Sequence, residues 1–147
     1  MSEMKLDDMV LNISDEIHVD APLDVTFEAL LEQLGPGTST PDGKSLDLKV
    51  EAWPGGRWYR DLGGDNGHYW ATVKAIVRPT LLEFVGPMAA SYPVAGNIQY
   101  RLKEEAGGTL ITFRHLAFGQ IPANAKEQMT MGWGMINGGV KKIAEGK

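Results

Sequence analysis

Residues 129–136 near the C-terminus, Met-Thr-Met-Gly-Trp-Gly-Met-Ile, decide the fold. If residues 121–145 form a helix, apolar side chains recur at offsets of four, three, four and three, namely Met129, Trp133, Ile136, Val140 and Ile143. Such a stripe lies on one face of an α-helix and needs a large apolar surface to cover it. The pattern predicts a long amphipathic helix packed across a sheet.

Much of the preceding chain consists of short segments in which apolar and polar residues alternate, as in half-buried strands. These predicted strands are residues 11–19, 46–52, 57–61, 68–77, 81–85, 98–102 and 109–118. Short turns join most of them, at 54–56, 63–67, 78–80 and 104–108. Strands connected by short turns pair antiparallel, so we expect one antiparallel sheet.

One helix is predicted between the first two strands. Ala21-Pro22 begins it, because proline at the first helical position loses no hydrogen bond. Its apolar stripe is Leu23, Phe27, Leu30 and Leu34, and Gly35-Pro36 ends it. The fold class is therefore α+β, with a curved sheet of six to seven strands wrapped around the C-terminal helix. Whether that helix covers a packed core or a cavity remains open.

Length and composition point to one domain spanning residues 1–147. A net charge of −5 without a run of Lys and Arg argues against nucleic-acid binding. The absence of cysteine excludes disulfides and thiolate chemistry. Residues 1–12 lack the basic start of a signal peptide, and no apolar stretch is long enough for a membrane span. We expect a cytoplasmic monomer or homodimer.

Several motifs, in this order and spacing, carry a resemblance to a known family. They are Ala21-Pro22, Pro54-Gly55-Gly56-Arg57-Trp58, the 67–79 strand ending in Val77-Arg78-Pro79, 81–84, Gly107-Gly108-Thr109 with His115 following, and Gly132-Trp133. Over roughly residues 13–143 the sequence resembles the START-like, birch-pollen-allergen-like helix-grip superfamily, often labelled SRPBCC. Within it, the chain is similar to the branch of the activator of heat-shock protein 90 ATPase.

The resemblance implies a seven-stranded sheet, two short helices near the first strand, and a C-terminal helix over a cavity for hydrophobic ligands. Family members include lipid and hormone binders, polyketide cyclases and co-chaperones. This sequence departs from the pattern in two places. A polar loop, 36–45, stands where relatives carry a second short helix, so we expect one or two helices there. Gly138-Gly139 interrupts the last helix at about 1 kcal/mol per glycine, which predicts a bend, fraying or room for something beneath.

His115 is the first candidate for chemistry. It shares the strand phase of Ile111 and Phe113, so its imidazole is expected to point inward. There it would orient a ligand or act as an acid–base group together with Tyr100. The alternative is a structural histidine hydrogen-bonded to the backbone or to a neighbour such as Tyr100.

An inward aromatic set is the second candidate, and either lines a pocket or forms an ordinary core. With its neighbours it gives the predicted ligand-binding residues, Trp58, Tyr69, Phe84, Tyr100, Phe113, His115, Met129 and Trp133. Trp53 and Trp70 fall on the opposite phase and are expected at the surface or in a turn. No metal site is expected, because the histidines have no ligand spacing. No cofactor is expected either, because the glycine pairs are hairpin turns and not phosphate-binding loops.

Three functions follow as hypotheses. The first is binding of a small hydrophobic or aromatic molecule between the sheet and the C-terminal helix. The second is an enzyme of the polyketide cyclase or dehydratase type in the same cavity, with His115 as its acid–base group. The third is a chaperone-interacting protein, as the resemblance implies. For that third hypothesis we expect no ATPase stimulation, because 147 residues leave no room for the additional N-terminal domain of the eukaryotic activators.

Overall fold

A computed structural model describes residues 5–146; residues 1–4 and 147, the ends of the predicted domain, lie outside the described part. The elements in order are η1 (Leu6–Met9), β1 (Val10–Val19), α1 (Leu23–Leu34), β2 (Leu48–Val50), β3 (Arg57–Gly63), β4 (Asn66–Val77), β5 (Leu81–Val85), β6 (Val94–Glu105), β7 (Gly108–Gly119) and α2 (Ala125–Ala144). This is the predicted α+β order, preceded by a short 3₁₀ helix that the sequence pattern did not indicate.

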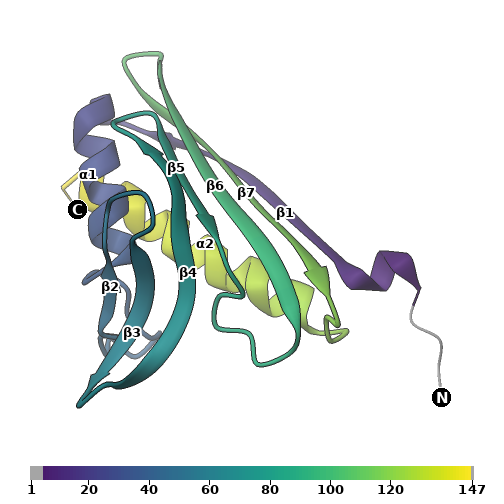
Figure 1. The fold of residues 1–147 in the computed structure, drawn as a ribbon. Coiled ribbons are helices and arrows are strands. Elements are labelled where there is room, and N and C mark those ends of the chain that lie inside the picture. Colours follow the sequence, from purple (N-terminus) through teal and green to yellow (C-terminus); the bar gives the residue numbers. More distant parts are fainter. Residues whose placement is uncertain (1–4, 147) are drawn as a thin grey trace.

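The seven strands form one antiparallel sheet in the order β1-β7-β6-β5-β4-β3-β2. The sheet curves around α2, which runs diagonally along its inner face, while α1 packs beside the C-terminal part of α2 (Figure 1). The predicted helix-grip architecture is therefore confirmed.

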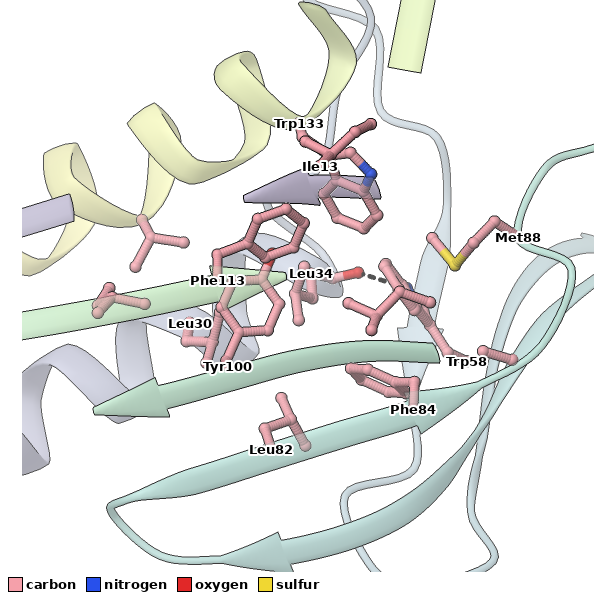
Figure 2. Packing of buried hydrophobic residues seen from close by; sticks show 14 of the residues in the cluster. Ile13, Leu30, Leu34, Trp58, Leu82, Phe84, Met88, Tyr100, Phe113 and Trp133 are labelled. Atoms are coloured by element: carbon pink, nitrogen blue, oxygen red, sulfur yellow. Dashed lines mark hydrogen bonds between the residues drawn. The ribbon is translucent and has the colours of Figure 1, made fainter. Parts of the chain in front are cut away.

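Helix α1 forms where the sequence predicts it, directly after Pro22. Its buried residues include Phe27, Leu30 and Leu34. The Trp58 indole N–H donates to the carbonyl of Leu34 at 2.8 Å, which ties the end of α1 to β3 (Figure 2). Among the described residues no second α-helix precedes β2. Of the one or two helices predicted after the first strand, the structure therefore has one.

Helix α2 runs without a break through Gly138 and Gly139 to Ala144, so the predicted early fraying is wrong. A Cβ atom at Gly139 would lie 2.4 Å from Oε1 of Gln33 on α1. Gly139 therefore lets α1 and α2 approach each other closely, and what occupies the room is a side chain of the first helix. The apolar stripe is buried at Trp133 and Val140, but Ile143 at its far end is 39% exposed.

The expected inward position of Tyr69 is wrong. Trp58 pairs with Ala71, whereas Tyr59 pairs with Tyr69, so Trp70 is an extra residue in the β4 strand. Such a bulge reverses the alternation of side chains. Tyr69 is 50% exposed, while Trp70 is half-buried and lies 5.4 Å from Trp58, ring centre to ring centre.

Two other predicted strand patterns also change. A second register irregularity lies between Val73 and Ala75, and beyond it Val77 is exposed while Ile76 packs on the core. The predicted strand at 46–52 is reduced to the three residues of β2, which begins directly after Asp47, a residue with a positive φ of 53°. Trp53 is exposed, as expected.

Candidate ligand-binding site beneath the C-terminal helix

The inner face of β7 carries the candidate histidine. Alternation along this strand buries Ile111, Phe113, His115 and Ala117, and His115 is 2% exposed. Its neighbour across the β6–β7 pair is Ile98, which is also buried. The predicted inward direction of His115 is therefore confirmed.

The partner of His115 is Trp133 of α2, whose indole N–H donates to Nδ1 of the imidazole at 2.9 Å. An indole nitrogen is only a donor, so Nδ1 must be the unprotonated nitrogen of a neutral imidazole. The ring proton is then on Nε2. Nε2 has no hydrogen-bond partner among the described residues. The site therefore holds a neutral imidazole with one free N–H donor.

Burial keeps that imidazole neutral. Desolvation lowers the pKa of His115 from 6.5 to about 4, because the cation would lose its hydration in this apolar surround. At neutral pH the His115 side chain carries no charge, and its tautomer is fixed by Trp133.

A small space lies beside His115. Its lining includes Gly96 of β6 and Tyr92 of the connection between β5 and β6. Met129 of α2 and Ile121, which precedes that helix, also line it. Nε2 lies 3.3 Å from the position that a Cβ atom would take at Gly96, so a glycine keeps this side of the ring open. The volume is about 10 Å³, roughly the lower limit for a single water molecule.

The centre of the core is filled by the predicted aromatic residues themselves. Trp133 lies 4.7 Å from Phe113 and 6.4 Å from Trp58, measured between ring centres, and Trp58 lies 4.7 Å from Phe84 (Figure 2). Phe113 also contacts Tyr100 at 4.9 Å. Of the two alternatives for these rings, the structure has the packed aromatic core.

A second polar contact between α2 and the sheet involves a residue that sequence reasoning missed. The Tyr100 hydroxyl donates to Oδ1 of Asn137 at 2.8 Å, and both residues are buried. Burial holds the pKa of the Tyr100 hydroxyl well above 10. Nδ2 of Asn137 is buried without a partner among the described residues. The available signal was an amide four residues after Trp133, on the same helix face.

These two hydrogen bonds join successive turns of α2 to the sheet. Trp133 and Asn137 are one helical turn apart, while their partners His115 and Tyr100 sit diagonally on adjacent strands, with Phe113 between them. The structure thus brings together seven of the eight predicted ligand-binding residues at this helix–sheet boundary. The eighth, Tyr69, lies outside it.

Other features of the described residues add no chemistry at this site. No group of three or more His, Asp or Glu side chains between residues 5 and 146 is placed to hold a metal ion. In the same range, no helix has the length and apolar character needed to cross a membrane. A larger groove of about 770 Å³ lies outside α1, beside Arg78, Pro79 and Ile143, and none of the predicted site residues lines it.

Comparison with known proteins gives a family and a fold. The family model described as "Activator of Hsp90 ATPase homolog 1-like protein" matches residues 20–145. No curated protein matches the sequence.

Three solved structures represent the structural likeness. A putative uncharacterized protein from Rhizobium leguminosarum superimposes with a TM-score of 0.72 at 18% identity, covering 94% of this chain and 96% of that one. Ara h 8.0201 gives 0.68 at 14% identity, with 94% and 99% covered. StfQ, a di-domain ARO/CYC from the steffimycin biosynthetic pathway, gives 0.65 at 13% identity, with 96% and 51% covered. At these identities the likeness establishes the fold.

Proposed function

We propose a binding function on the premise that the chain belongs to the family of Activator of Hsp90 ATPase homolog 1-like proteins. The ligand is a small apolar molecule that carries one hydrogen-bond acceptor, and it binds beneath the N-terminal half of α2. The observation that carries this proposal is the free Nε2–H of His115, a buried neutral donor that faces an apolar space.

The chemistry of the lining defines the ligand. Pockets for small molecules combine an apolar wall with a few placed polar groups that fix orientation. Here Ile121, Met129 and Leu11 supply the apolar wall. His115 supplies a donor, which suits a carbonyl or hydroxyl oxygen. A neutral donor in this surround gives no reason to prefer a charged ligand.

Binding requires the space to widen, because about 10 Å³ holds no organic molecule. The N–H of Gly86 donates to Gly96 and that of Met88 donates to Trp70, so the start of the β5–β6 connection is anchored. Residues 89–93 lie between these anchors and β6 and belong to no helix or strand. Met129 is half-buried, and methionine repacks easily. We therefore assign the widening to residues 89–93 and the Met129 side chain.

The cyclase hypothesis receives less support from this geometry. A general base at the space would need a lone pair on Nε2, but the lone pair of the imidazole is on Nδ1 and faces Trp133. The raised pKa of Tyr100 opposes its ionisation. His115 and Tyr100 as catalytic residues stay predictions, and binding ranks first. The chaperone-interacting role also stays a prediction.

The test is a titration with an environment-sensitive hydrophobic dye, followed by displacement with planar aromatic ketones and their deoxygenated analogues. We expect saturable uptake and tighter binding of the ketones. Met129→Ala enlarges the space and should tighten binding, whereas Gln128→Ala, the exposed neighbour on the same helix, should not change it.

The variant His115→Asn tests the contribution of the hydrogen-bond donor separately from that of the cavity. Asparagine keeps an acceptor near the Trp133 N–H but removes the Nε2–H. We expect ketone affinity to fall about tenfold, the effect of one neutral hydrogen bond, with no change for the deoxygenated analogues. The outward-facing Leu116→Ala on the same strand is the matched control. The proposal is wrong if neither the wild type nor Met129→Ala takes up any compound saturably.

A further inference from the structure

The outer face of α2, turned away from the sheet, carries glycines that the fold does not require. A Cβ atom at Gly134 or Gly138 would meet nothing within 4 Å, in contrast to Gly139, which contacts Gln33. Each glycine in a helix interior costs about 1 kcal/mol relative to alanine. Packing within the chain does not compensate this cost at Gly134 and Gly138.

Two exposed methionines share this face. Met131 is 66% exposed and Met135 is 53% exposed. At 100° per residue they fall in one sector with the two glycines and with two charged residues near the helix ends. We define the outer face of α2 as Glu127, Met131, Gly134, Met135, Gly138 and Lys142.

The outer face is palindromic. Its successive offsets are four, three, one, three and four, which read the same in both directions. An antiparallel second copy, related by a two-fold axis between positions 134 and 135, therefore sets Met131 opposite the partner's Gly138. Next to the axis, Met135 lies against the partner's Met135 and Gly134 against the partner's Gly134, because a two-fold axis keeps each residue on its own side of the seam. Met131 therefore meets a position without a side chain, and the two Met135 side chains pack on each other.

The charges are matched by the same axis. Glu127 falls opposite the partner's Lys142, and by symmetry the pair occurs twice. Within residues 5–146 neither side chain takes part in a hydrogen bond or ion pair, so both are available. Opposite charges at the two ends would fix the register and the antiparallel direction of the helices.

We propose that the outer face of α2 is the interface of a homodimer formed by two antiparallel α2 helices around this axis. A two-fold interface must be self-complementary in shape and charge, which this face is. The glycines let the helix axes approach, Met131 fills the position opposite the partner's Gly138, and the two Met135 side chains pack on each other.

A groove beside the face extends the contact. It has a volume of about 380 Å³ and lies between α2 and the 37–39 segment, with Thr38, Gly138 and Lys142 in its lining. In the proposed dimer the partner's Met131 enters this groove next to Gly138. The ligand site lies on the opposite face of α2, so the two proposals are independent of each other.

Sedimentation equilibrium across a wide range of protein concentration tests the interface. The wild type should show a monomer–dimer equilibrium. Glu127→Lys and Lys142→Glu each set like charges opposite one another twice, and each should raise the dimer dissociation constant at least about tenfold. Combining the two reversals restores opposite charges and should return the constant to within about threefold of the wild type.

Replacing the glycines with alanine affects the stability of the monomer and the affinity of the dimer in opposite directions. Gly134→Ala with Gly138→Ala should raise the unfolding temperature of dilute, monomeric protein, because alanine favours the helix. The same substitutions should weaken the dimer about tenfold, because a methyl group at position 138 takes the place of the partner's Met131 and one at position 134 meets its symmetry copy and holds the helix axes apart. A wild type that stays monomeric at every concentration overturns the proposal. So does a dimer that the single charge reversals leave unchanged.

Discussion

The two halves of the inner face of α2 differ, although one apolar stripe runs through both. In the C-terminal half, Asn137 and Val140 are buried, and Gly139 lies directly against Gln33 of α1. In the N-terminal half, Met129 is half-buried and a small space remains beside the free donor of His115. The C-terminal half is closed by a second helix, whereas the N-terminal half is covered by a loop.

This difference locates the site on physical grounds. Widening the C-terminal half would separate two packed helices, whereas widening the N-terminal half moves one methionine and residues 89–93. Regions that open most easily have few buried apolar contacts and irregular backbone. Four predictions test the comparison.

The largest effect is expected at the boundary between the halves. Trp133→Ala should lower the free energy of unfolding by about 4 kcal/mol, because the ring fills the space between Phe113 and Trp58. Met129→Ala, one turn earlier, should cost less than half as much. Urea unfolding of both variants measures the difference. Equal losses would mean that the N-terminal half is as tightly packed as the rest.

The next effect is a dependence on pH that arises from His115. The folded state keeps the imidazole neutral down to about pH 4, whereas the unfolded chain binds a proton below its ordinary pKa of about 6.5. Between these values the unfolded state holds more protons, so stability falls as the pH falls. The shift corresponds to about 3 kcal/mol at most.

Comparison with His115→Asn isolates this contribution. Carboxylates such as Asp61 and Glu51, whose pKa values are lowered by Lys49 and Arg57, also destabilise the fold in acid, but they do so equally in both proteins. As the pH falls from 6.5 to 4, the wild type should lose unfolding free energy relative to the variant. Below about pH 4 the difference between the two proteins should stay constant. Parallel pH profiles would show that folding does not lower the pKa of His115.

A smaller effect is expected at the Tyr100–Asn137 hydrogen bond, in the C-terminal half of α2. Tyr100→Phe leaves Oδ1 of Asn137 without its donor, and Asn137→Leu leaves the Tyr100 hydroxyl without its acceptor. Each should cost about 2 kcal/mol, as for a buried polar group that loses its partner. The double variant should recover most of this loss, because it also removes the unpaired Nδ2 of Asn137. A double variant with additive losses would contradict this account.

The fold was predictable from the sequence because its signals are periodic and local. The stripe at Trp133 and Val140, the start of α1 after Pro22 and the alternation along β7 each follow from side-chain spacing alone. The predicted inward position of Tyr69 was wrong because a bulge at Trp70 shifts the alternation of side chains by one residue. Nothing in the sequence of β4 marks this bulge.

The site was only partly predictable, because its chemistry depends on contacts between distant elements. Strand phase alone directs His115 inward. Its tautomer depends on Trp133, which is eighteen residues further along the chain, and Asn137 acquires its role only through Tyr100. Alternation also cannot distinguish a lined cavity from a filled core, since the same residue types build both.

The smallest effect contrasts the two adjacent glycines of α2. Gly138→Ala should raise the free energy of unfolding by about 0.5–1 kcal/mol in dilute protein, because its Cβ meets nothing and alanine favours the helix. Gly139→Ala should gain less or lose stability, because its Cβ displaces the buried Gln33 amide. Gly139→Ala with Gln33→Ala removes that clash and should recover the helix gain at position 139. Thermal unfolding of the three variants at low protein concentration measures this, and an equal gain at both glycines would mean that α1 does not press on α2 at Gln33.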